Sequence, residues 1–279
     1  MQSVKKVMDK PYFLCLKGHY LSAYGMSAVR GEEQWISLDL SQYCGNPAEF
    51  LRDLPFDKIG AFVFEPGNAS GMVKLPPVGL ISAIGGKIKE NGGIIIVNEV
   101  TTGIGRTGKW FGHQHYDIRP DVVSMGKGIG NGYPVSVIAL SKHIADLIEK
   151  SGFRYLQSHQ DDPLGCAVVN EVIQVIENNG YVQQAARMGT VLEGELKSLQ
   201  KRHDCVKEVR GVGLMYVVEF YHGLPLEKIH KDLFDAGYIT GIAALANLLR
   251  FYPPLTIDEA QIKGMTHALD EILSKDVDM

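Results

Sequence analysis

The chain has 279 residues, of which 45% are hydrophobic and 22% charged, and its formal net charge is −4. This length suggests one large or two ordinary domains, and the mixed, slightly acidic charge excludes a dedicated nucleic-acid surface. No apolar run approaches the ~20 residues of a membrane helix, and no hydrophobic block of a secretory signal follows the first methionine. The four cysteines are scattered, which predicts neither a disulfide framework nor a zinc site. We therefore expect a soluble cytoplasmic protein without nucleic-acid or membrane partners.

The first half of the sequence predicts an α/β layer. We expect a strand at Tyr12–Leu16, and three continuous apolar runs, KIGAFVFE, GGIIIVNEV and DVVSMGKG, end at Glu65, Val100 and Gly128. Continuous runs of this kind are typical of strands that are buried on both faces of a parallel sheet. The apolar spacing of Val78–Glu90 predicts a helix between the first two runs.

The second half predicts a smaller α+β domain. The expected elements are helices at Leu164–Glu177 and Tyr181–Lys201, a glycine-bounded strand GVGLMYVVEF, a helix at Leu226–Ala236, a strand at Leu248–Phe251 and a helix at Ile257–Leu273. We place the boundary after residue 163, so that the domains are 1–163 and 164–279.

The glycine-rich segment GIGRTGKW matches two nucleotide-binding patterns by its letters only. A dinucleotide fingerprint needs its glycines directly after a strand and a helix directly after them, and neither condition is met here. A Walker A loop needs Ser or Thr after its lysine, where this chain has Trp110. We interpret the segment as an ordered loop in which Arg106 has a structural role.

Lys127 follows a predicted buried strand and lies between two glycines, Gly126 and Gly128. Ligands of open α/β sheets collect beyond the carboxyl ends of the strands. A partly desolvated lysine there becomes a nucleophilic amine that can form a Schiff base. The spacing alone favours the alternative, a lysine that extends into solvent from a strand end.

The wider sequence context favours the nucleophile. The stretch GGIIIVNEVTTGIGRTGKWFGHQHYDIRPDVVSMGKGIGNGYP resembles the class III (subgroup II) aminotransferases that use pyridoxal 5′-phosphate, and the interval from Asn98 to Lys127 matches without a gap. The resemblance continues in FEPGNASGMVKLPP, QSHQDDPLG, VRGVGLMYVVEF and LRFYPPLTIDE. It implies the fold type I of these transferases, with a mostly parallel large domain and a smaller α+β C-terminal domain. It also implies transfer of an amino group between an amino acid and a 2-oxo acid.

The resemblance assigns roles to individual positions. Lys127 matches the Schiff-base lysine, and Tyr20 and Val100 match the residues on the two faces of the pyridine ring. Ser158 matches a threonine that holds the cofactor phosphate from the partner subunit, and its hydroxyl can supply the same hydrogen bond. Arg250 matches the arginine that pairs with the substrate α-carboxylate.

Three cofactor-site and substrate-site positions differ from the family. Asn98 replaces the aspartate under the pyridine nitrogen, and because an amide supplies no charge we expect cofactor binding with slow transamination. Thr101 replaces a glutamine near the ring hydroxyl. Ser70 replaces a glutamate that some members use to occupy the carboxylate-binding arginine, which favours α-amino over ω-amino substrates.

The resemblance begins just before Tyr12, so the family's preceding segment, with its phosphate-binding loop, is missing. We expect a homodimer, or a second chain that supplies this segment. Two alternatives stay open: an amino-acid racemase or epimerase on the same scaffold, and a catalytically weakened cofactor-binding subunit.

Three histidines attract attention as well. His113 and His115 form an H-x-H pair without a recognisable third ligand, so we predict no metal site. His159 lies next to Ser158, where lining of the cofactor entrance and simple packing are equally plausible.

Overall fold

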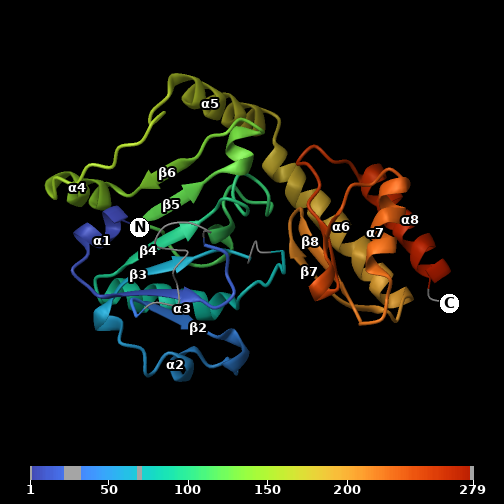
Figure 1. Cartoon of the computed structure of the whole chain (residues 1–279), viewed down its shortest axis with the longest axis horizontal. Coiled ribbons are helices and arrows are strands. Elements are labelled where there is room, and N and C mark those ends of the chain that lie inside the picture. Colours follow the sequence, from blue (N-terminus) through green and yellow to red (C-terminus); the bar gives the residue numbers. More distant parts are fainter. Residues whose placement is uncertain (1, 22–32, 68–70, 277–279) are drawn as a thin grey trace. The chain divides into compact units, whose positions relative to one another are not determined.

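The computed structural model describes residues 2–21, 33–67 and 71–276. The chain divides into two compact units (Figure 1). The first unit consists of Met1–Ala69, Pro76–Ile104 and Phe111–Val175. The second consists of Ser70–Leu75, Gly105–Trp110 and Ile176–Met279. The domain limits expected from the sequence, 1–163 and 164–279, stay a prediction.

The first unit contains a six-stranded sheet in the order β2-β1-β3-β4-β5-β6. Its strands are β1 Tyr12–Leu16, β2 Trp35–Leu38, β3 Ile59–Phe64, β4 Ile94–Asn98, β5 Val122–Met125 and β6 Val137–Leu140. All neighbouring strands are parallel except β5 and β6. The mostly parallel sheet is therefore confirmed, and β1, β3, β4 and β5 lie within the predicted runs.

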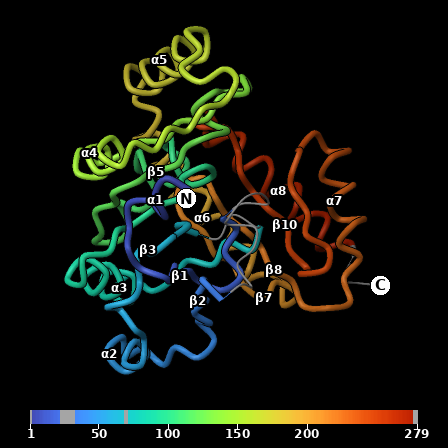
Figure 2. The backbone as a smooth tube through the Cα atoms, turned by 60° about the vertical axis from the view of Figure 1, so that its left-hand side comes forward, coloured from blue at the N-terminus to red at the C-terminus, as the bar shows by residue number. Residues whose placement is uncertain are grey.

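Helices cover both faces of this sheet (Figure 2). They are α1 Gln2–Val7 and α4 Lys142–Lys150 on one face and α2 Pro47–Phe50 and α3 Val78–Glu90 on the other. Helix α5, Pro163–Asn178, follows α4 along the chain. Successive side chains of a strand point to opposite faces, so Leu14 packs in the core beneath α3, whereas Phe13 packs with residues of α1 and α4. This two-sided burial explains why the central strands read as continuous apolar runs.

The second unit contains a four-stranded antiparallel sheet in the order β7-β8-β10-β9. Its elements are α6 Tyr181–Arg202, β7 Val206–Val212, β8 Met215–Phe220, α7 Leu226–Asp235, β9 Gly241–Ala243, β10 Leu248–Phe251 and α8 Glu259–Asp276. Helices α6, α7 and α8 share one core with β7, β8 and β10. The expected α+β architecture of the C-terminal part is therefore present.

The predicted strand GVGLMYVVEF is in fact the end of one strand and the whole of the next. The chain reverses at Gly213, whose φ of +57° lies in the left-handed region, and β7 pairs with β8 as a hairpin. The first arm, VKEVRGV, mixes charged with apolar residues and leaves most of its side chains partly or fully exposed. It therefore lacks the apolar run that identifies a buried strand.

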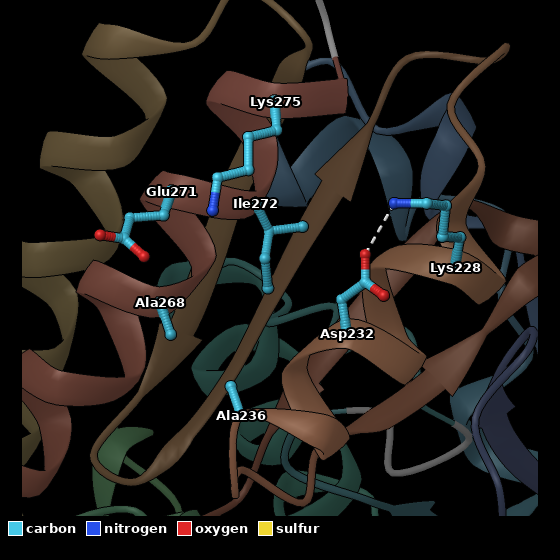
Figure 3. A pocket seen from close by; sticks show the side chains of 7 residues that line it. All are labelled: Lys228, Asp232, Ala236, Ala268, Glu271, Ile272 and Lys275. Atoms are coloured by element: carbon cyan, nitrogen blue, oxygen red, sulfur yellow. Dashed lines mark hydrogen bonds and ion pairs between the residues drawn. The ribbon is translucent and has the colours of Figure 1, made fainter.

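A shallow cavity of about 270 Å³ lies between α7 and α8 (Figure 3). Its apolar lining residues are Ala236, Ala268 and Ile272. Lys228, at its rim, donates to Asp232 one helical turn further on at 2.8 Å, an exposed i,i+4 pair that contributes a few tenths of a kcal/mol. Among the described residues, no helix combines the length and the apolar character that crossing a lipid bilayer requires.

Candidate functional site

The carboxyl ends of β1, β3, β4 and β5 lie at one edge of the first unit's sheet, because these strands are parallel. Polar residues follow each of these ends: Tyr20 after β1, Glu65 after β3, Asn98 as the last residue of β4 and Lys127 after β5. Crevices at this edge are where open α/β sheets bind ligands. The same end of the sheet thus gathers Tyr20, Asn98 and Lys127, to which the resemblance assigns cofactor-site roles, together with Glu65.

Lys127 is the first residue of the short 3-10 helix Lys127–Gly130 and has a φ of +48°. A non-glycine residue in the left-handed region is strained, and such strain clusters at functional sites. The side chain is exposed, and its Nζ donates to Thr101 Oγ1 at 2.8 Å. A cavity of about 420 Å³ opens beside it, lined by Lys127, Gly128, Asn131, Gly132, Tyr133, Pro134 and Val135.

Val100 and Thr101 follow β4 and lie next to the Lys127 turn. A Cβ atom placed on Gly126 would be 3.4 Å from Val100 Cγ1, so the Val100 side chain packs against this glycine. Thr101 supplies the oxygen that accepts the hydrogen bond from Lys127. The structure therefore brings Val100, Thr101 and Lys127 together.

Asn98 uses its side-chain amide to connect neighbouring segments of the first unit. Its Nδ2 donates to the carbonyl oxygens of Tyr20 at 3.2 Å and Leu21 at 3.5 Å. Its Oδ1 accepts from the Val100 N–H at 3.1 Å and from Ser124 Oγ at 3.4 Å. Asn98 and Tyr20 are therefore adjacent, but the amide already has partners for its two N–H groups and for its oxygen.

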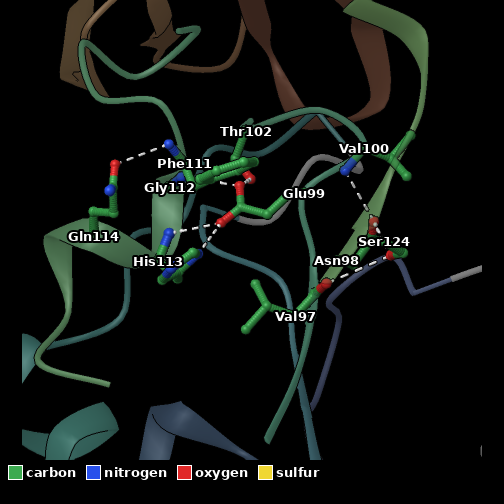
Figure 4. A network of polar contacts seen from close by, with 10 residues as sticks. All are labelled: Val97, Asn98, Glu99, Val100, Thr102, Phe111, Gly112, His113, Gln114 and Ser124. Carbon is green, nitrogen blue, oxygen red and sulfur yellow. Dashed lines mark hydrogen bonds and ion pairs between the residues drawn. The ribbon is translucent and has the colours of Figure 1, made fainter. Parts of the chain in front are cut away.

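Two buried glutamates at this edge were not identified from the sequence. Glu65 accepts from the Tyr20 N–H at 2.8 Å, while its own carbonyl oxygen lies 2.9 Å from His19 Nδ1. Glu99 is buried among donors from Thr102, Gly112 and His113 (Figure 4). The sequence did contain a signal for these two residues, because each glutamate lies at the end of an apolar run. A carboxylate that is buried there must find hydrogen-bond donors.

The remaining sequence-derived site residues of the first unit are more peripheral. Ser158 is exposed, and none of the hydrogen bonds found among the described residues joins it to Lys127, Thr101 or Asn98. His159, its neighbour, has a φ of +63°. Ser70 lies outside the described residues.

Arg250 belongs to β10 of the second unit. Its guanidinium group passes between two glycines: a Cβ atom on Gly71 would be 3.0 Å from Arg250 Nη1, and one on Gly241 would be 2.8 Å from Nε. Nη2 donates to the Ile242 carbonyl oxygen at 3.3 Å, and the buried Nε has no hydrogen-bond partner among the described residues. This arginine therefore retains donor capacity for an anion.

Arg106 has a structural role in the second unit. Its Nη1 donates to the carbonyl oxygens of Leu214, at 3.1 Å, and of Pro253. Burial lowers the pKa of its guanidinium group. Turns and the 3-10 helix Gly112–His115 follow the glycines of GIGRTGKW, so the α-helix that a dinucleotide fingerprint needs is not there.

His113 and His115 lie in that same 3-10 helix rather than in a strand. The His113 ring stacks on Phe111, with 5.6 Å between ring centroids, and its Nδ1 donates to Glu99 Oε1 at 2.9 Å. Within residues 2–21, 33–67 and 71–276, no group of three potential metal-ligating side chains was found.

The sequence is similar to that of curated proteins that are longer than this chain. The model of the class III aminotransferase family matches residues 11–273. The chain is 32% identical over 248 residues to ethanolamine-phosphate phospho-lyase homolog 1 of Caenorhabditis elegans, covering 84% of this chain and 53% of that protein. It is 32% identical over 230 residues to the acetylornithine aminotransferase of Caldanaerobacter subterraneus, covering 82% and 57%. The chain thus spans a little over half the length of these relatives.

Solved structures show the same fold. The S-selective transaminase from Arthrobacter sp. superposes with a TM-score of 0.87 at 22% identity, covering 98% of this chain and 72% of that one. The taurine:2-oxoglutarate aminotransferase from Bifidobacterium kashiwanohense superposes with a TM-score of 0.85 at 21% identity, covering 98% and 71%. The expected fold class is thereby confirmed. Since the family model spans nearly the whole sequence, the chain belongs to the class III aminotransferase family.

Proposed function

We propose that this chain forms the lysine-bearing part of an aminotransferase that uses pyridoxal 5′-phosphate to transfer an amino group between an amino acid and a 2-oxo acid. The observation that carries the proposal is the setting of Lys127. In a chain of this family, a strained and exposed lysine lies at the carboxyl edge of the sheet, next to a cavity, with its amine held by Thr101.

The residues present fit this cofactor in most respects. When bound, it would supply an electrophilic aldehyde and an electron-withdrawing ring. Lys127 would hold the cofactor through its exposed amine, beside the exposed Gly128, which has no side chain to obstruct it. Val100 lies against Gly126 and Tyr20 is half-exposed at the same sheet edge, as the two residues flanking the ring should be. Asn98 fits less well, because its amide already donates to two main-chain carbonyl oxygens.

The chain's own groups then divide the work between binding and proton transfer. Arg250, with its unpartnered Nε, would hold the carboxylate of the amino acid. The Lys127 amine, once displaced by the substrate amine, would move a proton as a general acid–base. Thr101 would orient that amine through its hydrogen bond.

We further propose that Ser158 contacts the cofactor phosphate across a homodimer interface and that the protein is cytoplasmic. The exposed position of Ser158 supports the first proposal. The second is supported by Cys44, Cys166 and Cys205, which are free thiols in the structure, since free thiols persist in a reducing compartment.

Borohydride trapping tests the assignment of Lys127. The protein is incubated with pyridoxal 5′-phosphate, reduced and mapped by peptide mass spectrometry, and we expect the pyridoxyl adduct at Lys127. Lys127→Ala should abolish this adduct, whereas Lys142→Ala, at a lysine that is highly exposed on α4, should leave it unchanged. Absence of an adduct at Lys127 in the unsubstituted protein would overturn the proposal.

Elimination of phosphate from ethanolamine phosphate is a second candidate function, because the relative with that name is 32% identical to this chain. Product analysis separates the two reactions. Amino-group transfer converts a 2-oxo acid into an amino acid, whereas elimination releases inorganic phosphate without needing a 2-oxo acid. Phosphate release from ethanolamine phosphate, with no transfer to any 2-oxo acid tested, would favour the second candidate.

A further inference from the structure

Glu99 is the most completely enclosed charged side chain near Lys127. Its side chain is fully buried, and each carboxylate oxygen accepts two hydrogen bonds (Figure 4). Oε2 accepts from Thr102 Oγ1 at 2.6 Å and from the Gly112 N–H at 2.9 Å. Oε1 accepts from the N–H of His113 at 2.8 Å and from its Nδ1 at 2.9 Å. Four donors around one buried carboxylate offset much of its desolvation cost.

These donors come from both ends of one long loop. Thr102 lies three residues after Glu99, whereas Gly112 and His113 lie at the far end, beyond the segment that belongs to the second unit. The two ends approach closely, because a Cβ atom on Gly112 would be 2.8 Å from Thr102 Cβ. The carboxylate therefore closes the base of the loop 99–113, within the first unit.

Glu99 also fixes the turn that contains Thr101, the residue that contacts Lys127. Thr101 precedes Thr102, the residue whose hydroxyl donates to Glu99 Oε2. The main chain of Glu99 is also fixed, because its N–H donates to the Ser124 carbonyl oxygen at 2.8 Å and its carbonyl oxygen accepts from the Gly103 N–H at 3.0 Å. Thr101 is thus held from both sides, and its Oγ1 accepts from Lys127 Nζ.

We propose that Glu99 is a positioning residue for Lys127: by closing the base of the loop 99–113, it holds the Thr101 hydroxyl where that group binds the Lys127 amine. Glu99 does not line the adjacent cavity, and the hydrogen bond found for the Lys127 amine within the described part of the chain goes to Thr101, so Glu99 acts through Thr101. The proposal deepens the proposed function, on which its relevance to catalysis rests. The positioning itself concerns only residues of this chain.

Competitive acylation with acetic anhydride tests the proposal without any cofactor. The rate at Lys127 is measured by mass spectrometry relative to the rate at Lys142 in the same sample. Thr101→Val removes the acceptor, and we expect Lys127 to react about fivefold faster, the factor that corresponds to a hydrogen bond of about 1 kcal/mol. Glu99→Gln places an N–H group among donors, so it should disturb the loop and raise the rate by a similar factor.

The combined variant distinguishes action through Thr101 from an independent effect. If Glu99 acts through Thr101, Glu99→Gln with Thr101→Val should react no faster than Thr101→Val alone, because the interaction is already lost. Multiplication of the two factors would overturn the proposal. An unchanged rate at Lys127 in folded Glu99→Gln protein would do so as well.

Asp121→Asn is the matched control for a general loss of stability. Asp121 also accepts a main-chain hydrogen bond, from the Ile95 N–H at 2.7 Å, but it lies before β5, at the opposite edge of the same sheet. We expect no change at Lys127 in this variant. An increase equal to that of Glu99→Gln would reveal an unspecific effect and overturn the proposal.

Thr102→Val keeps the test decisive if Glu99→Gln does not fold. This substitution removes one donor to Oε2 and retains the carboxylate and its three other donors, so we expect a smaller increase at Lys127. An unchanged rate would contradict the proposal. Because acylation requires no cofactor, the result stands apart from borohydride trapping, whose failure would overturn the proposed function alone.

Discussion

Asn98 illustrates at the scale of one residue how an amide differs from a carboxylate of the same shape. Its Nδ2 donates to the carbonyl oxygens of Tyr20 and Leu21, which fixes the segment after β1 against the end of β4. An aspartate at this position would direct an oxygen at two other oxygens. The amide is therefore explained by local hydrogen bonding, independently of any effect on the cofactor.

We predict that Asn98→Asp destabilises the protein at neutral pH by about 1–3 kcal/mol, the usual cost of a buried polar group that loses its partner. Burial and the two facing carbonyl oxygens should raise the pKa of the introduced carboxyl group above the ~3.9 of an unfolded aspartate. The neutral acid can still donate one hydrogen bond, so the loss should be small below about pH 4 and grow as the pH rises. Urea unfolding across this range measures the effect.

Asn91→Asp is the control for this prediction. Asn91 Nδ2 also donates to a carbonyl oxygen, that of Lys87 at 2.8 Å, but the residue is exposed after α3. Water can therefore solvate the new carboxylate, and we expect a change within about 0.5 kcal/mol. Equal losses in the two variants, or a loss in Asn98→Asp that does not depend on pH, would contradict our account of Asn98.

At the scale of elements, the segment Gly105–Trp110 packs tightly against α6 within the second unit. A Cβ atom on Gly108 would be 3.0 Å from Ala186 Cα and 3.1 Å from Ala186 Cβ. Because Ala186 lies inside α6, a larger residue at position 108 would have to displace helix backbone. Close packing against α6 thus explains why position 108 in GIGRTGKW is a glycine.

We predict that Gly108→Ala costs more than its backbone conformation alone explains. Gly108 and Gly18 share a φ of +79°, but a Cβ atom on Gly18 would meet nothing within 4 Å. Gly18→Ala should therefore cost only the left-handed penalty of about 1–2 kcal/mol. Gly108→Ala should add about 1–3 kcal/mol for overpacking against α6. Thermal unfolding of both variants tests this, and equal losses would show that the contact with Ala186 is unimportant.

How much the sequence predicts depends on whether an element is central or peripheral. The central strands were found because both their faces are buried, and α3 matches its predicted limits of Val78–Glu90. The edge strands β2 and β6 were missed: each has only four residues, and most side chains of β6 are exposed. A short strand of this kind lacks the continuous apolar run of a buried strand.

The same distinction applies to the candidate site. The proximity of Lys127 and Val100 follows from the sequence, because both come just after strands of one parallel sheet. The contacts of Glu99 could not be predicted, because its donors Gly112 and His113 lie more than ten residues away along a loop without periodicity. The hydrogen-bond partners of Asn98 depend on the path of the chain after β1. The residues around Asn98 in the sequence carry no information about that path.

At the scale of the whole molecule, the chain passes repeatedly between the two units. Ser70–Leu75 and Gly105–Trp110 belong to the second unit, but both ends of each segment continue into the first. Val73 is fully buried in a cluster with Met215, Val217 and Leu248. If the first unit unfolded, both segments would lose their fixed ends. Keeping Ser70–Leu75 and Gly105–Trp110 bound to the second unit would then cost conformational entropy, which favours their release. We therefore expect the units to unfold together.

The two tryptophans allow this expectation to be tested, because Trp35 lies in the first unit and Trp110 in the second. Trp110→Phe leaves Trp35 as the reporter of the first unit, and Trp35→Phe leaves Trp110 as the reporter of the second. We predict that urea unfolding followed by fluorescence has the same midpoint in both variants. Asp270→Asn should lower the free energy of unfolding at pH 7 by about 1–2 kcal/mol. Both urea midpoints should therefore fall, although Asp270 lies in the second unit only. Burial opposes ionisation of Asp270, but hydrogen bonds from His203 and Arg202 hold its pKa below the usual value. This stabilisation is present above about pH 4 and is lost as the pH falls further, so the difference between the two proteins should shrink as the pH is lowered below 4. A shift of the Trp110 midpoint alone would show that the units unfold independently.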